Sequence, residues 1–416
     1  MSQPPFSFKA MRILAVLLLP ALLLGGCRAS ATFDSRLSAI DASYRFSIFN
    51  WEVKSLSQEI GVAFSDKDKA TPDHPQVVVD YFSVMDKINA EQQAIEAITS
   101  GITGGDVKPY LSALSSLEQQ RDALAPQAEL VLESQVRATL NSLGIYNPLD
   151  GILDLKATFP PVLLRLQEPP KLLVVSPIGN ISRLATIPLN NNMSLNDINK
   201  LEDDVSALGV SALVVDLGGI ATYPSFVANR YGLQFALSTA VEEWCHQYLF
   251  FRPLGFRYGL EEMGFNEPDY IVTMNETLAG MVSDEVANVI YNKYYASYYP
   301  PASSSDGGGA TSGFNFNTFM HDTRVQVDSM LAQGQVTQAE AYMEQQRLIL
   351  ASHGYLIRKL NQAFFAFYGS YADQPGFENP ISENLTTLRI NNASLATFLE
   401  EASGFTNPNE LEQAIK

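Results

Sequence analysis

The 416-residue chain is long enough to bury a large hydrophobic core and to form two or three domains. Hydrophobic residues make up 46% of the sequence and charged residues 17%, a balance typical of folded globular proteins rather than disordered ones. The formal net charge of −18 gives an acidic surface that repels phosphate backbones, which argues against DNA or RNA as a partner.

The first 26 residues have the features of a secretory signal peptide. Lys9 and Arg12 precede an apolar run, residues 13–24, that is too short for a comfortable membrane span. The run ends in Leu-Gly-Gly-Cys, which resembles the lipobox of bacterial lipoproteins. That resemblance implies cleavage before Cys27, lipidation of Cys27, and an extracytoplasmic protein anchored to the cell membrane. The alternative is an ordinary secretory signal that ends near a chance cysteine.

Residues 27–147 are predicted to form a helical bundle or stalk. Apolar and aromatic residues recur at spacings of three and four in residues 35–64 and again in residues 77–143. A charged, proline-containing connection, residues 66–75, separates the two stretches. These patterns predict two to four antiparallel helices whose apolar residues face a common core.

Residues 148–416 are predicted to form an α+β domain, so that the whole chain is α+β and predominantly helical. Short β-type runs and an amphipathic helix capped by Ser194 or Asn196 lead into a long apolar helix. The β-type runs cover residues 160–177, 181–189 and 212–217, the amphipathic helix residues 195–208, and the apolar helix residues 238–255.

Helical patterns return in the last third of the chain. Residues 269–299 are helical in pattern and rich in tyrosine. The low-complexity stretch 300–313 is predicted to be a disordered loop. Residues 319–368 predict long helices with interruptions at 333–336 and 353–354.

The apolar helix carries Glu242, Glu243 and His246. At about 100° per residue, Glu242 and His246 share one helix face, with Glu243 beside them. This arrangement resembles the His-Glu-x-x-His helix of zinc peptidases, with Glu242 in place of the first histidine. The resemblance implies that Glu242 and His246 bind metal and that Glu243 acts as the general base.

A third ligand is suggested by Glu276, which lies 30 residues after His246. The pair Asn275-Glu276, followed by small and apolar residues, resembles the third-ligand helix of gluzincins, the thermolysin- and aminopeptidase-like clan. The resemblance implies a zinc site of Glu242, His246 and Glu276. Asp284 and Glu285 are candidates to support the ligands from behind.

The same resemblance implies a zincin-like fold for residues 148–416 and a membrane-anchored metallopeptidase that hydrolyses peptide or protein substrates with metal-activated water. The strand-like stretch 217–223 could lie beside the motif helix and pair with an extended peptide. An oxyanion in the transition state needs a hydrogen-bond donor, and Tyr371 is a candidate for that role. Tyr355, His321 and His353 are further candidates for that role.

The replaced histidine leaves a second hypothesis open. Two carboxylates and one imidazole make bound zinc less Lewis-acidic than two imidazoles and one carboxylate, and they shift preference toward other divalent metals. The alternative is therefore a catalytically inactive relative, without metal, that acts as an envelope binding or scaffold lipoprotein.

Simpler interpretations of the motif residues also remain. Glu242, Glu243 and His246 could form a solvated acidic patch, and Glu276 could cap or pair within its helix. Glu-x-x-His is also half of a di-iron motif, but the sequence contains no second copy. Cys245 is predicted to be a small core residue, with a soft ligand role as the alternative.

Overall fold

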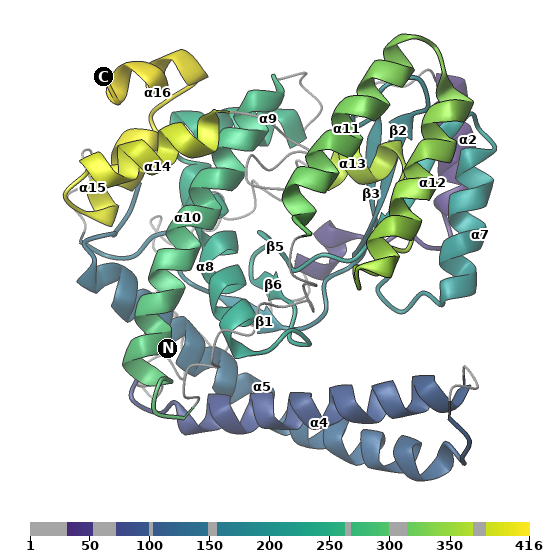
Figure 1. Ribbon diagram of the computed structural model, residues 1–416. Coiled ribbons are helices and arrows are strands. Elements are labelled where there is room, and N and C mark those ends of the chain that lie inside the picture. Colours follow the sequence, from purple (N-terminus) through teal and green to yellow (C-terminus); the bar gives the residue numbers. More distant parts are fainter. Residues whose placement is uncertain are drawn as a thin grey trace, which may run out of the picture.

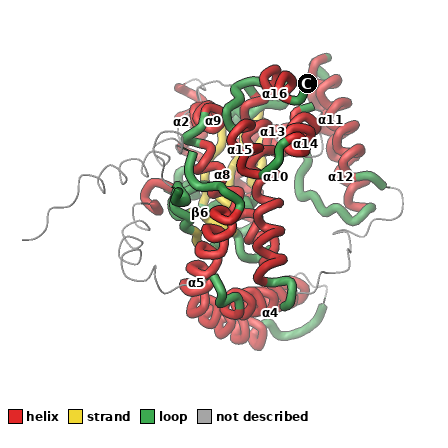
Figure 2. Tube along the Cα trace, turned by 90° about the vertical axis from the view of Figure 1, so that its left-hand side faces the viewer, coloured by secondary structure: helices red, strands yellow, loops and turns green. Residues whose placement is uncertain are grey.

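The computed structural model describes residues 31–52, 72–99, 103–148, 156–262, 268–298, 314–368 and 380–416. The fold is mostly helical with two small three-stranded sheets, so the predicted class is confirmed (Figures 1 and 2). Cys27, Tyr371 and the loop 300–313 lie outside the described residues, and the predictions made for them stay predictions.

The first sheet is an antiparallel β3-β2-β4 sheet covered by helices on both faces (Figure 1). Side chains alternate between the two faces of a strand, so Leu173 and Val175 pack on α2 and α7, whereas Val174 faces α13. Helices α11 and α12 form a hairpin whose core includes Phe365 of α13. The strands are β2 (Lys171–Pro177), β3 (Ala185–Leu189) and β4 (Val210–Val215). The helices are α2 (Ala31–Asp41), α7 (Leu195–Ser206), α11 (Phe316–Ala332), α12 (Val336–Ser352) and α13 (Gln362–Tyr368).

Most of the predicted elements of this part are present. Helix α7 begins with a capping box, in which the Ser194 side chain accepts the Asp197 N–H and Asp197 reaches back to Ser194, so Ser194 is the cap. The interruptions predicted near 333–336 and 353–354 fall at the ends of α11 and α12.

The predicted N-terminal bundle is divided between two places. Helix α2 packs through Leu37 on the first sheet, and it is not part of a bundle. The antiparallel pair consists of α4 (Gln76–Thr99) and α5 (Lys108–Ser142). Their buried residues are concentrated at one end of the pair, in residues 78–88 and 128–140, and the rest extends as an arm (Figure 1). The apolar stripe of α2 predicted a packed helix, but nothing in that stripe identified the sheet as its partner.

The main core lies between α5, α8 (Leu233–Leu249) and α10 (Asp269–Tyr294). Trp244 is buried there and donates its indole N–H to the Pro160 carbonyl at 2.8 Å. Cys245 is also fully buried, as predicted for a core residue. Four shorter helices surround this core: α9 (Pro253–Glu262), α14 (Ile381–Asn391), α15 (Leu395–Ala402) and α16 (Pro408–Ala414).

The second sheet has the order β1-β6-β5, formed by β1 (Leu164–Leu166), β6 (Ser225–Val227) and β5 (Gly219–Ile220). Glu133 of α5 accepts the Leu164 N–H at 3.0 Å, and Glu129 accepts the Leu166 N–H at 2.9 Å. Two strand residues advance about 6.6 Å and four helix residues about 6 Å, so the two spacings match. The helix therefore covers the outer edge of β1 in place of another strand.

The outer edge of β4 is covered in a similar way. Glu202 accepts the Val214 N–H at 2.7 Å, and Arg358 donates to the Val214 carbonyl at 3.0 Å. Asn361 donates to the Ala212 carbonyl at 3.0 Å. Strand β5 differs, because within the described part of the chain no side chain of another element bonds to its outer edge.

Candidate metal centre

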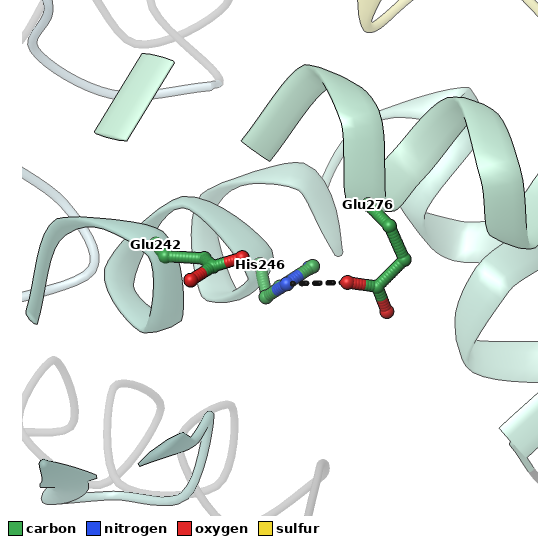
Figure 3. Close-up of side chains that lie close together, drawn as sticks. All are labelled: Glu242, His246 and Glu276. Atoms are coloured by element: carbon green, nitrogen blue, oxygen red, sulfur yellow. Dashed lines mark ion pairs between the residues drawn. The ribbon is translucent and has the colours of Figure 1, made fainter. Parts of the chain in front are cut away.

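Three side chains from two helices converge as predicted from the sequence. Glu242 and His246 project from α8, and Glu276 faces them from α10 (Figure 3). One ligand atom from each residue can be chosen so that all three lie within 4.8 Å of one another. The side chains of His246 and Glu276 are 11% and 10% exposed, so the cluster is not a fully solvated acidic patch.

His246 is oriented by a residue next to its partner. Its Nδ1 lies 2.8 Å from the amide Oδ1 of Asn275, which is fully buried. Because an amide oxygen only accepts, Nδ1 carries the proton and Nε2 keeps its lone pair when the imidazole is neutral. Metal-binding histidines nearly always donate their second ring N–H in this way. Nε2 is the nitrogen that faces Glu276, 3.5 Å from Oε2.

The spacing of these atoms fits a divalent cation. Ligand atoms bound tetrahedrally to zinc at about 2.0–2.1 Å lie about 3.4 Å apart. The distance between His246 Nε2 and Glu276 Oε2 is close to this value, and Glu242 needs only a small side-chain shift. One imidazole nitrogen and two carboxylate oxygens suit zinc and also harder divalent metals.

Tyr258 of α9 completes the surroundings of Glu276. Its hydroxyl donates to Glu276 Oε1 at 2.8 Å, while Oε2 faces His246. Its ring also stacks beside the His246 ring, with centroids 5.6 Å apart. Tyr258 was not predicted from the sequence, since a single tyrosine 12 positions after His246 forms no recognisable pattern.

Glu243 is buried between α8 and β5. A Cβ at Gly219 would lie 2.3 Å from Glu243 Oε1 and 2.5 Å from Thr239 Cγ2, so only glycine allows this close approach. Burial raises the pKa of the Glu243 carboxyl to about 8, although the nearby charge of His246 acts in the opposite direction. The residue predicted to be the base therefore lies beside the cluster and against the outer strand of the second sheet.

His246 and Glu276 favour each other's charged forms. Burial acts to lower the pKa of His246, but the negative charges of Glu276, Glu243 and Glu242 outweigh it and raise the pKa to about 10. Burial acts to raise the pKa of Glu276, but His246, the Tyr258 hydroxyl and the charge of Arg183 together lower it. Arg183, in the connection between β2 and β3, is a cation near the site that sequence reasoning did not identify.

The residues expected to support the ligands have other partners. Asp284 accepts a hydrogen bond from Ser238 at 3.1 Å, and Glu285 pairs with Arg389 at 2.8 and 2.9 Å. Both follow Glu276 by more than two helical turns, about 12 Å along α10. Asn275 and Tyr258 contact the ligands instead.

The further oxyanion candidates lie in or beside the α11–α12 hairpin. Tyr355 stacks on Phe316 with centroids 4.4 Å apart, and His353 stacks on Phe314 at 4.0 Å. His321 Nδ1 lies 3.2 Å from Asp322. The tyrosine that the structure brings to the cluster is Tyr258.

Comparisons with protein-family models, with curated proteins and with solved structures find no match to this chain. None of the helices in the described ranges is long and apolar enough to cross a membrane.

Proposed function

We propose that the chain is a metal-dependent peptidase with a zincin-like domain, in which Glu242, His246 and Glu276 hold a divalent metal. The observation that carries this proposal is the convergence of the three donors, with His246 oriented by Asn275. A metal bound there would supply Lewis acidity to the scissile carbonyl group.

Glu243 is the general base in this proposal. It accepts a proton from the attacking water and returns it to the leaving amine. Its position next to the cluster supports this role, as does a pKa of about 8, because proton transfer is most effective when the catalytic pKa lies near the working pH.

The outer edge of β5 is the proposed substrate-binding strand. An extended peptide can add to an exposed sheet edge through main-chain hydrogen bonds. Gly219 lets β5 lie directly against Glu243, so a peptide paired with β5 would pass near the base. Main-chain pairing accepts many sequences, which supports peptides or proteins as the substrate class.

The proposed location is the extracytoplasmic side of the cell membrane, where a lipidated Cys27 anchors the protein. The lipobox-like sequence supports this location. Detergent partitioning of the expressed protein tests it. The proposal fails if Cys27→Ser leaves membrane association and processing unchanged.

One observation favours a second candidate, an inactive relative that serves as an envelope binding or scaffold lipoprotein. His246 and Glu276 already form an ion pair that satisfies both groups without a metal. In that function the arm of α4 and α5 is the contact surface, because its outer part projects from the body of the protein (Figure 1).

A peptidase assay separates the two functions. The full-length protein is treated with chelator, reloaded with zinc, and incubated with an unfolded protein substrate, and new chain ends are identified by mass spectrometry. We expect cleavage by the parent and a loss of about 10²- to 10⁴-fold for Glu243→Gln, with zinc still bound. Glu285→Gln is the matched control, since Glu285 pairs with Arg389 away from the cluster. No zinc after loading, together with no cleavage, would favour the inactive relative.

A further inference from the structure

The inference concerns a strip of α8 that leads away from the candidate metal centre. Most side chains of α8 are buried, but those of Gln234 and Phe235 in the first turn and of Ser238, Glu242 and His246 further on are not. The last four of these positions are spaced by three or four residues, so they form one continuous strip along the helix. The strip ends at the candidate metal centre on one side and at an aromatic pair on the other.

The aromatic pair consists of Tyr231, just before α8, and Phe235 in its first turn. Tyr231 is 50% exposed and Phe235 38%, and their ring centroids are 4.7 Å apart. The guanidinium of Arg230 covers the Tyr231 ring at 4.7 Å and pairs with Glu168 and Asp216 at 3.2 and 3.3 Å. These contacts hold Tyr231 in place while half of its surface remains open.

The pair also adjoins Gly218, the residue just before β5. A Cβ at Gly218 would lie 2.7 Å from Phe235 Cζ, so Gly218 rests on the Phe235 ring just as Gly219 rests on Glu243. Two consecutive glycines, one just before β5 and one within it, thus lie against α8, Gly218 against the Phe235 ring and Gly219 against Glu243.

The distance along α8 from the aromatic pair to the candidate metal centre is one that a single extended peptide can span. Phe235 and Glu242 are two helical turns apart, about 10.5 Å along α8. An extended chain covers that distance in about three residues. A peptide that pairs with β5 and presents its scissile bond at Glu243 thus carries a side chain roughly three residues away past Tyr231 and Phe235.

From this placement we infer that Tyr231 and Phe235 form a specificity subsite for an aromatic side chain of an extended peptide, about three residues from the scissile bond. The inference rests on the proposed function for the position of that bond. An aromatic side chain fits because ring pairs gain an attraction beyond the burial of apolar area. An aliphatic side chain buries area alone and binds less well.

Binding is measured first, without catalysis. The peptides are ten residues long, fluorescently labelled and polar, and each carries one Phe at a different position. Their binding to the chelator-treated full-length protein is measured by fluorescence polarisation. An otherwise identical peptide with Ala in place of Phe is the reference. We expect one register to bind roughly tenfold more tightly than the reference. Phe235→Ala and Tyr231→Ala, each checked for native thermal unfolding, should remove the difference.

Tyr110→Ala is the matched control, because Tyr110 is 36% exposed on the arm, and it should keep the full preference. Phe235→Ala could act indirectly by moving Gly218, which lies against the Phe235 ring. Tyr231→Ala removes the other ring without removing that contact, so it tests the subsite itself. The subsite is overturned if the parent does not distinguish Phe from Ala at any position, or if both variants at the pair keep the preference. It is also overturned if the pair instead holds a second copy of the chain, seen as a dimer that Phe235→Ala dissociates.

A cleavage assay with the zinc-loaded protein then separates this inference from the proposed function. Cleavage at sites with an aromatic residue about three positions away, lost in Phe235→Ala, supports both. Cleavage without that preference overturns the subsite and leaves the peptidase proposal standing. Selective binding without cleavage retains an aromatic peptide site and overturns the peptidase.

Discussion

The two ends of the second sheet use the same helical spacing for different purposes. At one end, Glu129 and Glu133 of α5 accept backbone N–H groups of β1. At the other end, α8 packs against β5 through Thr239 and Glu243, and Glu242 and His246 of the same helix face Glu276. Both pairs are four residues apart. The difference lies in what each pair faces: Glu129 and Glu133 face the free edge of a strand and bond to its backbone, whereas Glu242 and His246 face another carboxylate and form a candidate metal site.

The outer edges of the strands differ in the same way. The edges of β1 and β4 are covered by side chains, which prevents other chains from pairing there. Strand β5 lies against Glu243, and within the described residues no side chain of another element bonds to its outer edge. Single substitutions can disrupt the covered edge of β1, the contact between β5 and α8, and the covered edge of β4.

The largest effect is expected from Glu129→Leu. The change leaves the Leu166 N–H without its acceptor and removes the partner of Arg165, whose Nη1 lies 2.8 Å from Glu129. We expect the free energy of unfolding to fall by about 3 kcal/mol, measured by urea denaturation. Glu118→Leu on the outer part of α5 is the control and should change stability by less than about 1 kcal/mol. Equal losses for both variants would show that the covered edge contributes nothing specific.

Gly219→Ala should close the contact between β5 and α8. The new methyl group would overlap Glu243 and Thr239, so strand and helix must separate. We expect a loss of about 1–3 kcal/mol in unfolding free energy together with lower peptidase activity. Gly280→Ala on α10 is the control, because no atom lies within 4 Å of its added Cβ. An active, fully stable Gly219→Ala variant would refute the close approach.

Glu202→Gln tests the covered edge of β4 through its pH dependence. Burial acts to raise the pKa of Glu202, but Arg358, Lys359 and the Val214 N–H outweigh it and lower the pKa. A folded pKa below the unfolded value gives stability that is present above about pH 4.5 and is lost as the pH falls through the folded pKa.

The Glu202→Gln variant should therefore be less stable than the parent by about 1–3 kcal/mol at pH 7, and the difference should shrink toward pH 3. Urea denaturation at several pH values measures this. A difference that grows on acidification would reverse the assigned sign.

The sequence predicted most helices and the convergence of Glu242, His246 and Glu276 because their signals are local. Periodic apolar residues marked α10, α11 and α12, and the spacing of Glu242 and His246 fixed their common face. The packing of α2 on a sheet, and the contacts of Asn275 and Tyr258 with the ligands, depend on tertiary placement. Glu129 and Glu133 gave no signal at all, since a buried acid on a helix looks like a surface acid until its backbone partner is known.

The most direct test of the central claim is a calorimetric zinc titration of Glu242→His beside the parent. If Glu242 occupies a ligand position, an imidazole there completes a two-histidine, one-carboxylate set and removes one negative charge. We predict one zinc per chain in both proteins and at least tenfold tighter binding in Glu242→His. Equal or absent zinc binding in the two proteins would contradict the convergence of Glu242, His246 and Glu276 on one metal.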